Sequence, residues 1–290
     1  MSQTDVSDSE YQSVSARASQ LSKAQQANLL AELAQELSGQ SKKVDPAGLS
    51  ITQAEDALFD EIWRRTAGQV TGLCLDGLPS PEQYFKDPNR TLFVFKEANL
   101  LGADKQTQDI RGKLRKRSQR RAAGERIKWE PWWDRKVALF AHAIQLGDWE
   151  SFQYKELPNL LQYGFIELKR TAGGGNANDA LMKHLVARDA DLLRVQLELY
   201  KPRIILACGK STSPAVLLSS LVLQDKAVPV DPIEGLKAWT GTWSSGERFI
   251  MLETLHPSFR ITKTLNQQGV YQNLARAYAS AQAQLLRDNG

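Results

Sequence analysis

A histidine, a proline and a serine follow an apolar run near the carboxyl end of the chain. The run covers residues 249–252, with the sequence FIML, and His256-Pro257-Ser258 comes shortly after it. We expect a short buried strand that presents the imidazole at its carboxyl edge, with proline stiffening the turn and the serine hydroxyl free to meet a phosphate. Open α/β sheets form their binding sites at this edge.

A carboxylate stands in the corresponding place after an earlier apolar run. Residues 91–95 read TLFVF, and the sequence KEAN follows directly, with Glu97 as its acid. A third apolar run, residues 203–208, ends at Gly209. The chain therefore offers a carboxylate and a histidine on the ends of two expected strands.

The order and spacing of these strand ends resemble the uracil-DNA glycosylase superfamily. In that family a first strand ends in a motif like G-E-x-P-G, a third strand ends in glycine and a fourth ends in H-P-S. The resemblance covers roughly residues 90 to 285. It implies that Glu97 positions or activates water, or stabilises the charged sugar, and that His256 donates a hydrogen bond to a base carbonyl.

These residue types suit the chemistry. Cleavage of an N-glycosidic bond develops positive charge on the sugar and negative charge on the departing base. A site for this reaction needs an anion near the sugar and hydrogen-bond donors near the base. Glu97 and His256 supply an anion and a donor of this kind.

The loop after the first strand departs from the family pattern. Lys96 and Asn99 stand where many relatives have flanking glycine and proline. Asn99 can itself hold a water, so we count it with the catalytic residues. The residues of this segment expected to contact the base are Phe95, Lys96 and Ala98.

The second expected strand, residues 163–168, carries Glu167 where uracil enzymes commonly have an asparagine. A carboxylate only accepts hydrogen bonds, and among base edges it suits an exocyclic amino group such as that of cytosine. The sequence therefore favours a cytosine derivative over uracil. The alternative is that Glu167 pairs with Lys169 or Arg170.

Several residues are candidates for contacts with the DNA backbone. Ser258, and Lys210-Ser211 at an expected helix start, are placed to bind phosphates. Phe259-Arg260 follows the His-Pro-Ser motif where relatives place a side chain that wedges into the duplex. Such insertion offsets part of the few kcal/mol that base flipping costs.

A basic block precedes the second strand. Residues 111–121 contain seven Lys or Arg and no acid, whereas residues 1–60 carry nine acids against four bases. Such a block concentrates positive potential where a polyanion can bind. The alternative is a solvated helix or loop without a partner. The cations assigned to DNA are Arg115, Lys116, Arg120 and Arg121.

The composition argues against membrane-spanning, disulfide-rich and metal-binding proteins. The apolar share of 42% supports a core, and no stretch approaches the ~20 apolar residues of a membrane span. Two distant cysteines, Cys74 and Cys208, indicate neither a disulfide framework nor a metal site, and they are too few for a four-cysteine iron–sulfur cluster. We expect a cytoplasmic monomer without metal or cofactor.

The alternation of apolar runs and helical patterns predicts an α/β fold. We expect a three-layer α/β/α sandwich around a four-stranded parallel sheet, in residues 67–290, and a partly disordered N-terminal helical extension in residues 1–66. The expected strands are 91–95, 163–168, 203–208 and 248–254, and residues 225–246 are expected to be an irregular loop. The expected helices are 16–37, 52–65, 135–146, 178–199, 212–223 and 270–286.

The resulting hypothesis is a monofunctional DNA glycosylase that acts on a flipped pyrimidine, in phage defence or in base-excision repair. The competing hypothesis is a non-catalytic nucleic-acid-binding module, in which Lys96 and Asn99 have spoiled the site.

Overall fold

The structure is a computed structural model. It describes residues 49–66, 72–97, 107–125, 132–146, 159–171, 179–209, 213–230, 236–256 and 267–287. Contacts divide the chain into two compact units, Met1–Ser41 and Lys42–Gly290, and all described residues belong to the second. The helix expected at residues 16–37 lies outside the described residues.

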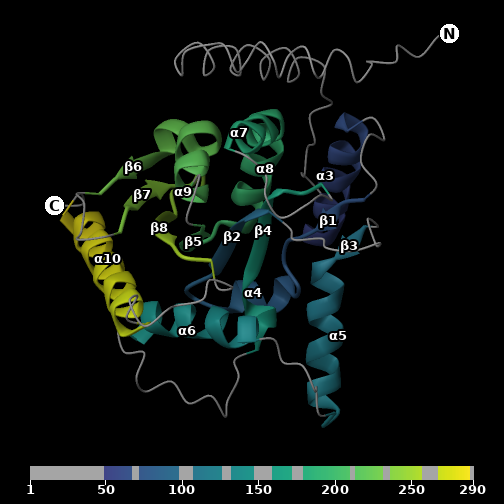
Figure 1. The fold of residues 1–290 in the computed structure, drawn as a ribbon, viewed down its shortest axis with the longest axis horizontal. Helices are drawn as coiled ribbons and strands as arrows, with labels where there is room; N and C mark the ends of the chain where they lie inside the picture. Colours follow the sequence, from purple (N-terminus) through teal and green to yellow (C-terminus); the bar gives the residue numbers. More distant parts are fainter. Residues whose placement is uncertain are drawn as a thin grey trace. The chain divides into compact units, whose positions relative to one another are not determined.

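The described residues form eight α-helices and eight strands (Figure 1). The helices are α3 (Ile51–Arg65), α4 (Pro81–Lys86), α5 (Ile110–Ala122), α6 (Trp132–Leu146), α7 (Asp179–Arg188), α8 (Ala190–Tyr200), α9 (Pro214–Leu217) and α10 (Gln267–Arg287). The strands are β1 (Cys74–Leu75), β2 (Thr91–Glu97), β3 (Gln108–Asp109), β4 (Gly164–Lys169), β5 (Ile204–Cys208), β6 (Ala227–Pro229), β7 (Ala238–Thr242) and β8 (Arg248–Thr254). Short helical turns are η1 (Leu160–Gln162), η2 (Leu218–Leu223) and η3 (Gln224–Lys226).

The main sheet has six strands in the order β4-β2-β5-β8-β7-β6. The four strands expected from the sequence are all present, and β4, β2, β5 and β8 are parallel to one another. The α/β class is therefore confirmed. The expectation of a four-stranded, wholly parallel sheet is wrong, because β7 and β6 add two antiparallel strands beside β8.

The segment 225–246 contains these two additional strands and is not a wholly irregular loop. Gly241 lies in β7, where a Cβ atom would come 2.1 Å from the Lys226 carbonyl oxygen and 2.3 Å from the Phe249 ring. Glycine is required here by a close approach of neighbouring chain. It does not mark a break in the strand.

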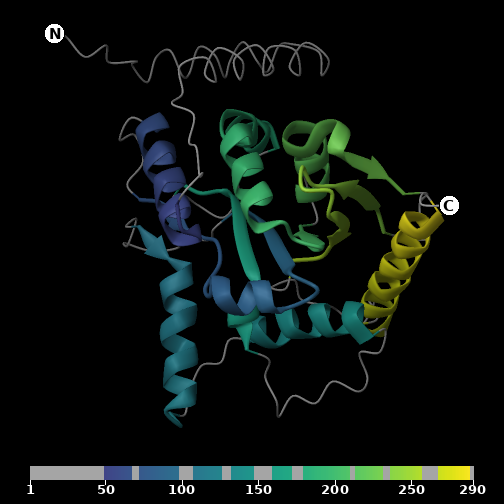
Figure 2. The same ribbon diagram turned by 180° about the vertical axis from the view of Figure 1, so that it is seen from behind.

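Helices cover both faces of the sheet (Figures 1 and 2). Leu92 and Val94 of β2 belong to one apolar cluster, which includes side chains of α7, α8, α9 and η2. Phe93 and Phe95 belong to the other, which includes side chains of α6 and α10. The alternation follows from the two-residue period of a strand, because successive side chains point to opposite faces.

The expected helices within the described residues form with two differences, and α4 and α5 are additional to them. The pattern over residues 178–199 forms two helices, α7 and α8, which meet at Asp189. The pattern over 212–223 begins as α9 and continues as the π-helical turn η2. None of the helices in the described residues has the length and apolarity needed to cross a membrane.

Helix α3 begins with a capping box, in which Ser50 and Gln53 satisfy each other's backbone amides. Its apolar face packs in a third cluster, where Leu58, Phe59 and Ile62 lie with Leu192 of α8.

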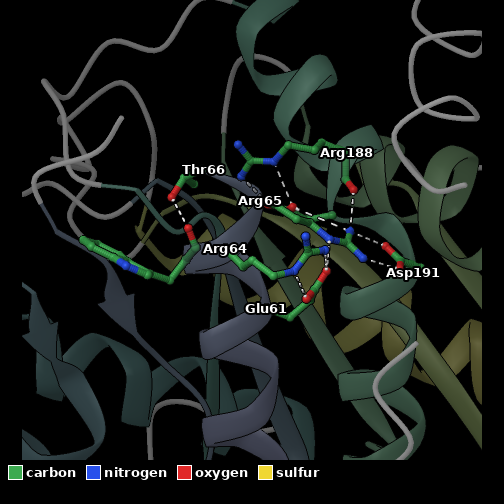
Figure 3. Close-up of polar contacts among 8 residues, drawn as sticks. Glu61, Arg64, Arg65, Thr66, Arg188 and Asp191 are labelled. Atoms are coloured by element: carbon green, nitrogen blue, oxygen red, sulfur yellow. Dashed lines mark hydrogen bonds and ion pairs between the residues drawn. The ribbon is translucent and has the colours of Figure 1, made fainter. Parts of the chain in front are cut away.

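Ion pairs fix the carboxyl end of α3. Arg65 binds Asp191 at 2.6 Å and donates to the Arg188 carbonyl at 2.8 Å, while Glu61 accepts from Arg64 and Arg65 (Figure 3). We call these four side chains and the Arg188 carbonyl the Arg65 cluster. It joins α3 to the α7–α8 junction.

Candidate active site at the carboxyl edge of the sheet

The candidate catalytic positions lie on one edge of the parallel strands. Phe95, Cys208 and Thr254 are aligned across β2, β5 and β8. Glu97 and His256 each lie two residues beyond this line. Only β5 separates their strands, so β2 and β8 lie roughly 10 Å apart, which is two strand spacings.

His256 lies against the aromatic end of β2. Its ring centroid is 5.0 Å from that of Phe95, with an interplanar angle of 61°. Burial and, to a smaller extent, the positive charge of Lys136 together lower the pKa of His256 to about 4. The imidazole is therefore neutral near pH 7, with one ring N–H to donate and one nitrogen to accept.

Lys136, on α6, is a residue that the sequence reasoning did not single out. Its side chain is half-buried, and burial lowers the pKa of its ammonium group. The residues after it, 137–144, are mostly apolar and buried. A cation at the start of a buried helical face was a signal in the sequence, although nothing there indicated that it would approach His256.

Glu167 lies on β4, at the same level of the sheet as Phe95. It pairs in register with Phe95 of the neighbouring strand β2, and it is only 7% exposed. Its charge adds to burial in raising the pKa of the Cys208 thiol on β5, so the carboxylate lies within electrostatic reach of that strand. Arg170, one of the two ion-pair partners considered for Glu167, contacts Asp76 and Gln196.

Lys96 faces a different helix from Phe95. Its ammonium nitrogen lies 3.9 Å from the carboxylate of Asp179, the first residue of α7. Phe95 packs on the opposite side of the sheet, in the cluster that includes α6 and α10. Among the residues expected to contact the base, Phe95 lies beside His256 and is in register with Glu167, whereas Lys96 faces α7.

Some candidate residues lie outside the described part of the chain. The backbone of Glu97 is described as the last residue of β2, but its side chain is not. The other candidates outside the described residues are Ala98, Asn99, Lys210, Ser211, Ser258, Phe259 and Arg260.

The basic block forms helix α5, which extends past the sheet in both views (Figures 1 and 2). Arg111 in its first turn is buried, whereas Lys116 and Arg120 are exposed and Arg115 and Arg121 are half-exposed. Arg120 pairs with Glu125 at 2.6 Å on the surface. The four cations assigned to DNA thus lie on the solvated part of one helix.

A shallow pocket adjoins this helix. It is lined by Arg117, Ser118 and Arg121 of α5, by Asn159, and by Leu160 and Leu161 of η1. Its guanidinium, hydroxyl and amide groups are all of types that bind phosphate oxygens.

Neither the comparison with protein-family models nor the search of curated proteins finds a match to this chain. Within the described residues, no group of three His, Cys, Asp or Glu is arranged to hold a metal ion.

Proposed function

We propose that the chain is a DNA glycosylase that hydrolyses the N-glycosidic bond of a flipped pyrimidine and leaves an abasic site. The observation that carries the proposal is the position of Phe95 at the carboxyl edge of the parallel strands, beside His256 and in register with Glu167. An aromatic face, a buried acceptor and a neutral imidazole are the groups that recognise a base. Glu97 supplies an acid at the end of β2, the strand that carries Phe95.

The proposed mechanism assigns one task to each residue. Phe95 stacks on the base, and Glu167 accepts a hydrogen bond from its exocyclic amino group. His256 donates its ring N–H to the base oxygen on which negative charge develops. Glu97 orients a water and accepts a proton from it as the water oxygen attacks the sugar carbon. The bond to the base breaks, and the base departs with the electron pair.

The low pKa of His256 supports its role as a neutral donor. A protonated imidazole in this place would require the solvation that burial has removed, and Lys136 adds a second cation nearby. The buried carboxylate of Glu167 supports a substrate with an amino group, because uracil presents a carbonyl at that point of its edge. We therefore rank cytosine derivatives, including the modified cytosines of phage DNA, above uracil.

An abasic-site assay tests the proposal. The protein would be incubated with duplexes that carry uracil, hypoxanthine, hydroxymethylcytosine or glucosylated hydroxymethylcytosine. Glu97→Ala should lose nearly all activity, and His256→Asn should keep part of it because an amide can still donate. Glu253→Ala is a matched control, since this carboxylate of β8 lies 3.9 Å from Lys237 and outside the proposed site.

The basic helix favours a second candidate, a non-catalytic nucleic-acid-binding module. Duplex binding without abasic sites on any of the four substrates would favour that candidate. Equal and small losses in Glu97→Ala and His256→Asn would remove both residues from the chemistry.

A further inference from the structure

On the outer edge of β4, the side chain of another segment occupies the hydrogen-bonding position of a neighbouring strand at Glu167. β4 is the edge strand of the main sheet, and the segment 73–77 runs antiparallel beside it, with bridges from Leu73 to Thr171 and from Gly77 to Phe165. Between these bridges, the carboxylate of Asp76 accepts the backbone N–H of Glu167 at 2.7 Å. A carboxylate therefore takes the place of a strand neighbour at the residue assigned to the base pocket.

The Asp76 carboxylate is itself held by two side chains. It is fully buried, its Oδ1 accepts from the Gln196 amide at 3.2 Å, and its Oδ2 lies 3.3 Å from Nε of Arg170. Arg170 also donates to the Gln196 oxygen. Burial raises the pKa of Asp76, and the charge of Arg170 opposes this rise. Gln196 and Arg170 thus hold the Asp76 carboxylate in the position from which it accepts the Glu167 amide.

The bonds continue from Gln196 to the basic helix. Gln196 donates to the Tyr200 hydroxyl at 2.7 Å, and Tyr200 donates to Glu55 of α3. Arg111, in the first turn of α5, donates to the other oxygen of Glu55 at 2.5 Å. Each link has a donor facing an acceptor, and all these side chains are buried.

A glycine leaves room for the hydrogen bond between Tyr200 and Glu55. Gly77 has a φ of +121°, and a Cβ atom there would lie 2.3 Å from the Glu55 carboxylate and 2.6 Å from the Tyr200 hydroxyl. The next residue, Leu78, donates its backbone N–H to Glu55 at 2.8 Å. The turn after Asp76 is therefore shaped around the same carboxylate that holds α5.

We propose that Asp76 is a positioning residue for the base pocket, and that the buried bonds from Asp76 to Arg111 couple this pocket to helix α5. The inference rests on the proposed function where it assigns Glu167 to the base and α5 to DNA. Asp76 fixes the main chain from which the Glu167 carboxylate projects. A displacement of the first turn of α5 is transmitted to the Glu167 backbone through these buried hydrogen bonds, which water does not replace.

The charges of this network are balanced, which explains why it can be buried. Glu55 and Asp76 supply two negative charges, and Arg111 and Arg170 supply two positive charges. Removing one member leaves an uncompensated buried charge, which is strongly destabilising. The variants that test the proposal must therefore be compared at matched stability.

The first experiment follows amide exchange of Glu167 by NMR in the full chain. Asp76→Ala should speed this exchange by about tenfold or more, since a hydrogen bond to a charged acceptor is lost. Asp76→Asn should have a smaller effect, because an amide oxygen can still accept the N–H. Glu61→Gln is the control, since Glu61 is buried in the Arg65 cluster, which joins α3 to the α7–α8 junction. Equal exchange at Glu167 in Asp76→Ala and Glu61→Gln, in denaturant that matches their stabilities, would overturn the positioning role.

The second experiment tests the coupling with an unmodified 20-base-pair duplex as the probe. Duplex binding should slow exchange of the Glu167 amide in the wild type. Tyr200→Phe keeps the ring but removes the link to Glu55, so it should abolish this slowing while the duplex still binds. Persistent slowing in Tyr200→Phe, or no slowing in the wild type, would refute the coupling.

Activity separates these ideas from the proposed function. Asp76→Asn should alter the preference between a cytosine derivative and uracil by several-fold, whereas Glu61→Gln should leave the ratio unchanged. Absence of abasic sites with every substrate would end the glycosylase proposal, but the exchange result would still decide whether Asp76 positions Glu167. An unaltered ratio in an active Asp76→Asn variant would show that Asp76 only stabilises the fold.

Discussion

His256 combines a partly buried ring, an aromatic neighbour and a nearby cation. Burial is the larger cause of its lowered pKa, and Lys136 the smaller. The ring therefore stays neutral through the range in which most proteins are studied, and its hydrogen-bonding pattern is constant there. This constancy suits a donor to a carbonyl oxygen and makes the residue a poor general acid at neutral pH.

The first prediction concerns acid stability. The pKa of His256 is about 4 in the folded chain against 6.5 for an ordinary histidine. The unfolded chain therefore takes up a proton first as the pH falls, and stability is lost between about pH 6.5 and pH 4. The contribution is at most about 3 kcal/mol. Urea unfolding of wild type and His256→Asn across this range should show a smaller loss in the variant, and parallel curves would contradict the buried neutral imidazole.

The second prediction concerns the base that is recognised. Glu167→Gln should weaken action on a cytosine derivative, because the amide must reorient to present its oxygen, and should favour uracil relative to the wild type. One such contact is worth about 1–3 kcal/mol, or roughly a tenfold change or more in relative rate. Competition assays with paired substrates would measure it. An unchanged preference would remove Glu167 from the pocket.

Some of these residues could be predicted and others could not, for a physical reason. Phe95, Glu167 and His256 lie at or just beyond the ends of apolar runs, and parallel strands bring such ends to one edge. Asp76 and Gln196 owe their roles to contacts between residues 120 positions apart. No local pattern marks such a pair, because each is an ordinary polar residue within its own segment.

Helix α5 is anchored in the fold at its first turn and exposed to solvent along its later turns. Its first turn is capped by Asp109, and Arg111 is paired with Glu55 and Asp56, whereas its later cations face solvent. The carboxyl-terminal end of a helix favours cations through the helix dipole. The helix is therefore held in place at its first turn and presents cations to solvent along its later turns, an arrangement that suits phosphate binding.

The third prediction follows from this arrangement. Replacing Arg115, Lys116, Arg120 and Arg121 with Glu should weaken binding to all DNA sequences alike and flatten the salt dependence, because phosphate contacts carry no sequence information. Fluorescence anisotropy over a salt series would measure both effects. Unchanged affinity at low salt would show that the helix is only a solvated surface.

A matched variant controls for net charge. The same four-fold reversal on exposed cations of other elements changes the total charge equally and leaves α5 intact, so affinity should fall much less. Suitable exposed residues are Lys86, Lys183, Lys237 and Arg276.

The strands differ in how far the sequence could reveal them. β2, β5 and β8 are continuous apolar runs because both of their faces are buried. β6 and β7 contain Pro229 and Gly241, which ordinarily indicate loops. Proline is tolerated because β6 is the edge strand, and glycine is required by the Phe249 ring. Both exceptions depend on neighbours that are distant in the sequence.

Helix α3 bears on where the folded unit begins. It supplies Leu58, Phe59 and Ile62 to the cluster with Leu192, and Glu55 to the network of Arg111 and Tyr200. These contacts all lie within residues 42–290. A boundary at residue 67 would cut through them.

The fourth prediction compares two truncations. The fragment 42–290 should unfold cooperatively, whereas 67–290 should not. Each buried side chain of α3 contributes about 1.5–3 kcal/mol, so losing three approaches the whole stability of a typical domain. Thermal unfolding followed by circular dichroism would distinguish the fragments. A cooperative transition in 67–290 would show that α3 is dispensable.

The interior place of β2 in the sheet has a consequence for synthesis of the chain. β2 pairs with β4 and β5, and both are made after it, β4 beginning about 70 residues later. At ~5–20 residues per second, the nascent strand waits roughly 3–14 s for its first partner. During this interval its apolar side chains and unpaired backbone groups are open to aggregation. We therefore expect the yield of folded protein to depend on chaperones that hold the nascent chain on the ribosome.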